Sequence, residues 1–245
     1  MATVVKILVK FIIPLLIAVL FSSCNFDINM SGVKGNGNVI TQKRLSDVKF
    51  TKIDASEGLD VYLTKSTSTV VKVQADDNVQ KFILTEVKDG TLHIHTSEPI
   101  GKTNAKKVLV NFTQLNEINS SSGADIHTTN FILSDNMILN ASSGSDQYLS
   151  VKATNIKCSA SSGADITLSG TTTTINADAS SGANISAKKL TSQDCAANAS
   201  SGADINLNCL KAINAKASSS ADISYTGNPT EVMVNESSAA RISKN

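Results

Sequence analysis

The hexapeptide Ser200-Ser201-Gly202-Ala203-Asp204-Ile205 constrains this chain more than any other feature, because close copies of it recur down to the C-terminus. The spacings between successive copies are 21, 19, 19, 20, 18 and 19 residues, measured at the glycine or its replacement: Gly123, Gly144, Gly163, Gly182, Gly202, Ser220 and Ala239. A period near 20 residues is typical of a solenoid, in which each repeat packs only on its neighbours. The sequence therefore predicts a repeat protein.

Alignment on this glycine predicts which side chains face the interior. Small residues stand three positions before it, at Ser120, Ala141, Ala160, Ala179, Ala199 and Ala217, and mostly isoleucine stands three positions after it, at Ile126, Gln147, Ile166, Ile185, Ile205, Ile223 and Ile242. Polar residues alternate with both sets, as in two half-buried strands joined by a Ser-Ser-Gly corner. Such strands pair with their equivalents in the next unit. We therefore expect an all-β fold, a right-handed parallel β-helix with coils of roughly 20 residues.

The region 48–113 is predicted to be a hairpin-containing β region that precedes the repeats of 114–245. Its apolar residues alternate with a period of two, at Val61 and Leu63, Val71 and Val73, Leu92 and Ile94, and Val108 and Val110. Asp89-Gly90 predicts a tight hairpin turn, and one short helical turn is expected between Asp77 and Ile83. The segment 53–63 fits the repeat template as a divergent further copy. This region is therefore expected to start the solenoid.

The N-terminus is similar to a bacterial lipoprotein signal. Lys6 and Lys10 precede a short apolar run that ends in Leu20-Phe21-Ser22-Ser23-Cys24, which resembles a lipobox. We predict a signal peptide over residues 1–23, lipidation of Cys24, and a polar, Gly-rich tether over 24–47. Asn25, rather than an aspartate, follows the cysteine, which favours the outer membrane, at its surface or its periplasmic face.

Acidic residues form the candidate binding surface. The outward position two residues after each corner glycine is occupied by Asp125, Asp146, Asp165, Asn184, Asp204 and Asp222, and then by Arg241. One interpretation is structural: these side chains accept hydrogen bonds from backbone N–H and serine hydroxyl groups at the corner. The other is a ligand-binding ladder, since Gly-Ala-Asp is similar to part of the calcium-binding nonapeptide repeat. The period here is too long for that motif and its second glycine is missing, so we expect no metal site.

Other reactive residues give no functional motif. Cys158, Cys195 and Cys209 lie in or near inward columns without Cys-x-x-Cys spacing, so all three are predicted to be free thiols that fill the core. His93 and His95 share one strand face and could hold a metal, although a solvated face is the commoner explanation. No serine-hydrolase signature is present. We predict no catalytic residue and no cofactor.

The chain resembles the head GIN domain family, a group common in Bacteroidetes whose members are described as autotransporter adhesins. The likeness lies in Gly35-Asn36-Gly37-Asn38, in the repeated Ser-Ser-Gly corner, and in the early unit Ile53-Asp54-Ala55-Ser56-Glu57-Gly58-Leu59-Asp60-Val61. The resemblance implies a β-helical envelope protein with a binding or adhesion role. It supplies no catalytic residues.

Three functional hypotheses follow. The first is a non-enzymatic, lipid-anchored envelope protein that presents a polar β-helix face to an unknown envelope or cell-surface macromolecule. The second is a periplasmic structural or envelope-stress component, which binds only its own copies or neighbouring proteins. The third, a polysaccharide-cleaving enzyme, rests on fold analogy alone. Nucleic acid is not expected as a partner, because the formal net charge is +1 and no basic stripe is present. The oligomeric state is left open.

Overall fold

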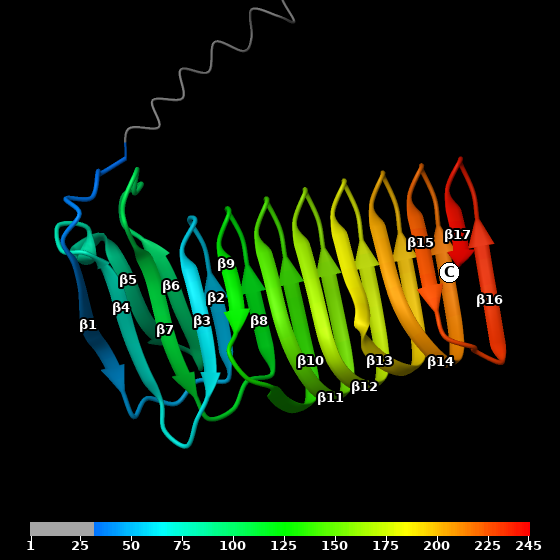
Figure 1. Cartoon of the computed structure of the whole chain (residues 1–245), viewed down its shortest axis with the longest axis horizontal. Coiled ribbons are helices and arrows are strands. Elements are labelled where there is room, and N and C mark those ends of the chain that lie inside the picture. The colour runs from blue at the N-terminus through cyan, green and yellow to red at the C-terminus, as the bar shows by residue number, and fades with distance from the viewer. Residues whose placement is uncertain (1–31) are drawn as a thin grey trace, which may run out of the picture. The chain divides into compact units, whose positions relative to one another are not determined.

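The computed structural model describes residues 32–245, which form one compact unit. The predicted signal peptide, Cys24 and the first part of the tether lie outside these residues. Within them no helix is long and apolar enough to cross a membrane. The chain folds into a parallel β-solenoid of about 7 turns (Figure 1), as the repeat predicts.

The described residues contain 17 strands and one 3-10 helix, Gln80–Phe82, inside the span where a helical turn was expected. The strands are β1 (Val39–Ser46), β2 (Lys52–Ala55), β3 (Asp60–Lys65), β4 (Val70–Asp76), β5 (Ile83–Lys88), β6 (Thr91–Thr96), β7 (Lys106–Phe112), β8 (Glu117–Ser120), β9 (Asp125–Thr128), β10 (Ile132–Ala141), β11 (Asp146–Ala160), β12 (Asp165–Ala179), β13 (Asn184–Ala199), β14 (Asp204–Ala217), β15 (Asp222–Thr226), β16 (Glu231–Glu236) and β17 (Arg241–Lys244).

Each coil has two strand layers. We call layer A the strands that run into a corner and layer B the strands that leave one. The strands β11 to β14 each start in layer B, bend near the middle and end in layer A, with parallel pairing to the next coil throughout. Figure 1 shows the corners along one edge of the solenoid and the bends along the opposite edge.

The corners are tight turns with two consecutive residues at positive φ. In one coil these are Ser162 at 54° and Gly163 at 70°, and the N–H of Ala164 donates to the carbonyl of Ser161 at 3.2 Å. This is the conformation of a type I′ turn. The N–H of each corner glycine also donates to a serine carbonyl of the following corner, as from Gly163 to Ser181 at 3.1 Å. The corners are therefore stacked by their own ladder of hydrogen bonds.

The second central residue of each corner has a positive φ, which favours glycine, and two coils have another residue there. Ser220 has a φ of 59° where earlier coils have glycine, and a Cβ added at Gly163 would meet nothing within 4 Å. We therefore expect Gly163→Ala to lower the free energy of unfolding by about 1 kcal/mol through backbone strain alone, and Ser220→Gly to raise it by about 1 kcal/mol. Chemical denaturation of the two variants checks both signs, and equal effects from both would contradict the strain argument.

The predicted columns form the core. The alanines three positions before the corner glycine are 3–4% exposed, apart from Ala55, which is fully buried. The side chains of Ile166, Ile185 and Ile205 are also fully buried. Gln147 takes the isoleucine position of its coil and is also buried, where its amide donates to Ser120 Oγ at 2.9 Å and to the Asn140 carbonyl at 2.8 Å. The alternation read from the sequence is confirmed.

The N-terminal region starts the solenoid, as expected. Strands β2 and β3 flank the corner at Gly58 and pair in parallel with β8 and β9 of the first full repeat. Beyond them β6 extends layer A and β7 extends layer B, and the antiparallel strands β5, β4 and β1 complete the two edges. The predicted hairpin at Asp89-Gly90 joins β5 and β6, with both residues at positive φ. These strands cover one end of the core.

The prediction of a tether is wrong for residues 32–47. The strand β1 pairs antiparallel with β4, from Val39 opposite Asp76 to Ser46 opposite Val70. Ahead of it, the buried Asp76 carboxylate accepts hydrogen bonds from the N–H groups of Gly37 at 2.8 Å and Asn104 at 3.1 Å. No hydrophobic period marks this segment because β1 is an edge strand with no fully buried residue, and hydrogen bonds to Asp76 and to the Pro99 carbonyl fix the chain ahead of it.

The prediction of three free cysteines is also wrong. Cys195 and Cys209 form a disulfide with Cα atoms 6.2 Å apart, whereas Cys158 is free and buried. Burial raises the pKa of the Cys158 thiol to about 12. The error arose from comparing each residue only with its neighbours along the solenoid. Cys195 and Cys209 stand seven residues before and seven after Gly202, so they face each other across the core of one coil.

Candidate binding surfaces on the two layers

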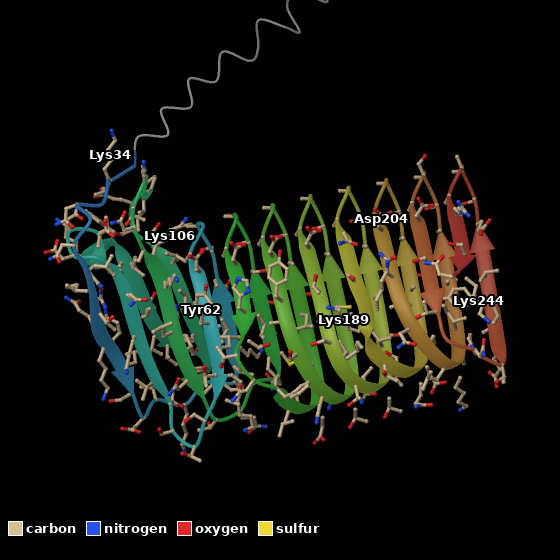
Figure 2. The ribbon with its side chains drawn as sticks, in the orientation of Figure 1. Lys34, Tyr62, Lys106, Lys189, Asp204 and Lys244 are labelled. Carbon is tan, nitrogen blue, oxygen red and sulfur yellow. A yellow bond between two sulfur atoms is a disulfide. The ribbon has the colours of Figure 1, made fainter. Side chains whose placement is uncertain are left out.

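The acidic column lies in register on the outer face of layer B. Strand pairing places Asp125, Asp146, Asp165, Asn184, Asp204 and Asp222 opposite one another in consecutive coils. In Figure 2 Asp204 lies close to the row of corners. The column also includes Asp60, and a cation stands opposite each terminal aspartate, Lys107 beside Asp60 and Arg241 beside Asp222. Its acidic interior is therefore bounded by positive charge.

The structural interpretation, in which these aspartates accept hydrogen bonds from groups at the corner, is wrong. The corner N–H groups donate to backbone carbonyls, as from Ala164 to Ser161. Burial, and then repulsion from Asp146, raise the pKa of Asp165, while a hydrogen bond with Asn184 opposes them. Burial and repulsion from Asp146 and Asp60 likewise raise the pKa of Asp125. The interior of the column is therefore electrostatically strained.

Removing one central charge of the column should stabilise the protein. The variant Asp146→Asn removes repulsion on both sides, so we expect the free energy of unfolding at pH 7 to rise by roughly 1 kcal/mol at low ionic strength and by less in high salt. Because the pKa values of Asp125 and Asp165 are raised in the folded state, the stability of the wild-type protein increases as the pH falls through the usual aspartate range. The gain from Asp146→Asn should therefore shrink below about pH 4.

The control for this prediction is Asp135→Asn, which removes a charge from an exposed bend residue outside the column. Urea denaturation at pH 7, at low and at high salt, compares the two variants. A loss of stability in Asp146→Asn would show that this carboxylate makes a favourable contact that outweighs the repulsion.

Three stacked rings lie beside the acidic column on layer B. The ring centroids of Tyr62 and His127 are 5.3 Å apart, and those of His127 and Tyr148 are 4.9 Å apart with nearly parallel planes. The hydroxyl of Tyr148 donates to Asp146 Oδ2 at 3.2 Å. Because the ring faces cover one another, this group stiffens the surface and leaves mainly ring edges for a ligand.

The two strand histidines each meet one carboxylate from a neighbouring strand. His93 Nδ1 lies 3.5 Å from Asp54 Oδ2, and His95 Nε2 lies 3.7 Å from Glu86 Oε1. Within residues 32–245 no group of three or more histidine, cysteine, aspartate or glutamate side chains is placed to hold a metal ion. In this part of the chain each of the two histidines therefore has one carboxylate neighbour rather than a set of metal ligands.

A groove of about 820 Å³ runs along the outer face of layer A, next to the corners. One wall is the column four residues before each corner glycine: Asp54, Asn119, Asn140, Ser159, Asp178, Asn198, Lys216 and Asn235. The other wall is the serine that opens each turn: Ser121, Ser142, Ser161, Ser180, Ser200, Ser218 and Ser237. The groove therefore touches every coil from β2 to β16.

The groove exists because small residues separate two rows of larger polar ones. Ala141, Ala160 and Ala179, with their equivalents, form the floor and retain 3–4% exposure. Strand pairing holds the polar wall in register from coil to coil. Hydrogen bonds order it further, from the Asn198 amide to Asp178 Oδ1 at 2.8 Å and from Asn140 to Asn119 Oδ1 at 2.8 Å.

Sequence reasoning missed this groove. The column that forms its wall contains aspartate, asparagine, serine and lysine, so no single residue type recurs as aspartate does on layer B. The signal that could have found it is positional: every corner has serine as the first turn residue, alanine or serine occupies the position before it in most coils, and a polar residue precedes that.

A comparison with protein-family models identifies the family to which the chain belongs. Residues 49–229 match the family model described as "Putative auto-transporter adhesin, head GIN domain". The chain belongs to the head GIN domain family. The match runs through both the N-terminal β region and the repeats, which agrees with their forming one compact unit. Membership indicates a non-enzymatic binding role at the cell envelope or surface.

Solved structures share the fold of this head GIN domain protein. An adhesin-like protein from Bacteroides fragilis has 23% identity and a TM-score of 0.81, and the match covers 87% of this chain and 100% of that one. One from Parabacteroides merdae has 16% identity and a TM-score of 0.71, with 87% and 98% covered. A Parabacteroides distasonis protein described as lipid binding has 20% identity and a TM-score of 0.70, with 87% and 99% covered. No curated protein matches the sequence.

Proposed function

We propose that this head GIN domain protein is a lipid-anchored adhesin of the cell envelope that binds a macromolecular partner in the layer A groove without catalysing a reaction. The observation that carries the proposal is the continuity of the groove over all coils from β2 to β16. A site that repeats the same wall and floor in each coil suits an elongated partner. The acidic column of layer B is a second exposed surface, but its side chains repel one another and none of them lines the layer A groove.

The arrangement of acids in the groove argues for binding rather than hydrolysis. Only Asp54 and Asp178 among the groove-lining residues are acidic, and four strand spacings separate them, or about 19 Å. Glycoside hydrolases place their paired carboxyl groups about 5–9.5 Å apart. This distance supports a non-enzymatic role over the polysaccharide-cleaving alternative.

The disulfide supports a location outside the cytoplasm. Bonds such as Cys195–Cys209 form and persist in oxidising compartments, including the periplasm and the cell surface. This agrees with the predicted signal peptide, lipidation of Cys24 and placement at the outer membrane. Metabolic labelling with a fatty acid should mark the wild-type chain and not Cys24→Ser, and protease treatment of intact cells distinguishes the outer surface from the periplasm.

The groove itself is tested by placing a photoreactive residue at one of two positions in the same coil. Ser159 lies in the groove wall, four residues before Gly163, and Thr167 lies on layer B, four residues after it. A partner held in the groove of intact cells should cross-link from position 159 and not from 167. Equal capture from both positions would remove the groove from the proposal.

One observation favours a second candidate function, self-association as an envelope component. All residues of β16 are exposed, including Val232 at 47%, Met233 at 62% and Val234 at 51%, and β16 pairs only with β14. Open sheet edges promote pairing with other chains. However, Glu236 Oε1 accepts the N–H of Ile242 at 2.6 Å, which occupies one backbone donor of the neighbouring strand β17. Sedimentation of a strict monomer at high concentration would exclude this candidate.

A further inference from the structure

We infer that the ligand of the layer A groove is a neutral, linear polysaccharide that lies along the solenoid axis, with about one sugar unit on each coil. The inference rests on the proposed binding function and adds the chemical class of the ligand. Its starting point is the repeat distance of the groove. Paired strands lie about 4.8 Å apart, which is close to the length of one hexopyranose unit in an extended chain.

The repeat distance discriminates between classes of polymer. An extended peptide advances 3.2–3.4 Å per residue, so its side chains and backbone groups would fall out of step with the coils within a few residues. A peptide also has no free strand edge to join here, because the backbone of β10 to β13 pairs on both sides within the sheet. An extended sugar chain advances by close to one coil per unit, so it stays in step with the wall and floor over more units than a peptide does.

The charge of the groove excludes polyanions. Its lining contains one basic residue, Lys216, and two acidic residues, Asp54 and Asp178. Nucleic acids and polyuronates need rows of lysine or arginine to neutralise their charge. A groove with a slight excess of acid and a majority of asparagine and serine fits a polymer without charge.

The lining chemistry matches a chain of hydroxyl groups. Asparagine amides and serine hydroxyls both donate and accept hydrogen bonds, as sugar hydroxyls do. The contact from Asn198 to Asp178 uses one amide hydrogen and one carboxylate oxygen, which leaves the other polar atoms of this pair for a ligand. The alanine floor offers methyl groups to the C–H face of each ring. No aromatic side chain lines the groove, so each unit binds weakly and affinity depends on length.

Oligosaccharides of defined length test this dependence. The mature chain carrying Cys24→Ser is titrated calorimetrically with neutral β-linked glucan, mannan and N-acetylglucosamine oligomers of two, four and eight units, and with uronic acid oligomers of the same lengths. For at least one neutral series we expect the eight-unit oligomer to bind at least ten-fold more tightly than the four-unit oligomer. The uronic acid series should not bind. A lack of binding by all neutral series overturns the inference.

A blocking variant places the ligand in the groove. Ser159 is the fourth of the eight wall residues, so Ser159→Trp should divide the groove and reduce the affinity of the eight-unit oligomer to that of the four-unit one. The matched control Thr167→Trp adds the same ring to the opposite layer and should leave affinity unchanged. Asn198→Ala, a smaller change in the wall, should weaken binding while the circular dichroism spectrum stays that of the wild type.

The outcomes separate this inference from the proposed function. Neutral oligomers that bind equally well to wild type and Ser159→Trp would overturn the groove as the sugar site. Cross-linking of a partner from position 159 without binding of any neutral oligomer would leave the binding role in place and overturn the polysaccharide.

Discussion

Replacing both Cys195 and Cys209 with alanine should lower the free energy of unfolding by about 3 kcal/mol. The bond closes a loop of 14 residues around the corner at Gly202, and the entropy that such a closure removes from the unfolded chain corresponds to about this value. The measurement is urea denaturation of the mature Cys24→Ser chain with and without the double substitution, under non-reducing conditions.

The free cysteine provides the control. Cys158→Ala removes a buried sulfur without breaking a cross-link, so its smaller loss measures packing alone. Thiol titration gives an independent reading: the denatured, unreduced Cys24→Ser chain should release one thiol, and the reduced chain three. Three thiols before reduction would contradict the bond, as would equal losses of stability in the double variant and Cys158→Ala.

The second large effect is expected at Ile205. This side chain is fully buried in the isoleucine column and stacks in register between Ile185 and Ile223. Ile205→Ala should lower the free energy of unfolding by about 2–5 kcal/mol, because it removes buried methylene groups and leaves a cavity between coils that pack only on their neighbours. Equilibrium denaturation measured by circular dichroism checks the loss.

The neighbouring residue supplies the matched control. Asp204 points outward from the same strand and is exposed, so Asp204→Ala should change stability by no more than about 0.5 kcal/mol. Similar losses at positions 204 and 205 would contradict the assignment of inner and outer faces. Retention of wild-type stability by Ile205→Ala would show that the coils can collapse around the missing side chain.

The solenoid could be predicted because the corner motif recurs in the sequence with a regular period. The corner residue, glycine in most coils, recurs every 18 to 21 residues and identifies equivalent positions, and the inward orientation of Ile166 and Ala160 then follows from alternation. The same reasoning placed Asp125 and Asp165 in one outward column. Aligning the repeats thus predicts which residues of consecutive coils lie next to each other.

The alignment of repeats does not predict contacts between the two strand layers of one coil. The bond between Cys195 and Cys209 depends on how flat the coil is, since only a flattened coil brings residues at equal distance from Gly202 face to face. The strand β1 was missed for another reason. Its position depends on Asp76, a buried carboxylate that is distant in sequence and shows no pattern of its own. The groove was missed because the residues of its wall share polarity from coil to coil but differ in residue type.

The attachment of β1 determines how the protein would respond to mechanical load. Tension applied through the chain ahead of Gly32 first meets the backbone hydrogen bonds that Val33 makes with Pro99 and Gly101. It then reaches the Asp76 hydrogen bond at Gly37, and after that the pairing of β1 with β4. A pull along β1 would load its backbone bonds together, whereas a pull across it would break them one after another. The coils that carry the groove lie beyond this junction. Resistance to such a pull would therefore be set by the Val33 contacts, one carboxylate and one edge strand, and not by the coils that carry the groove.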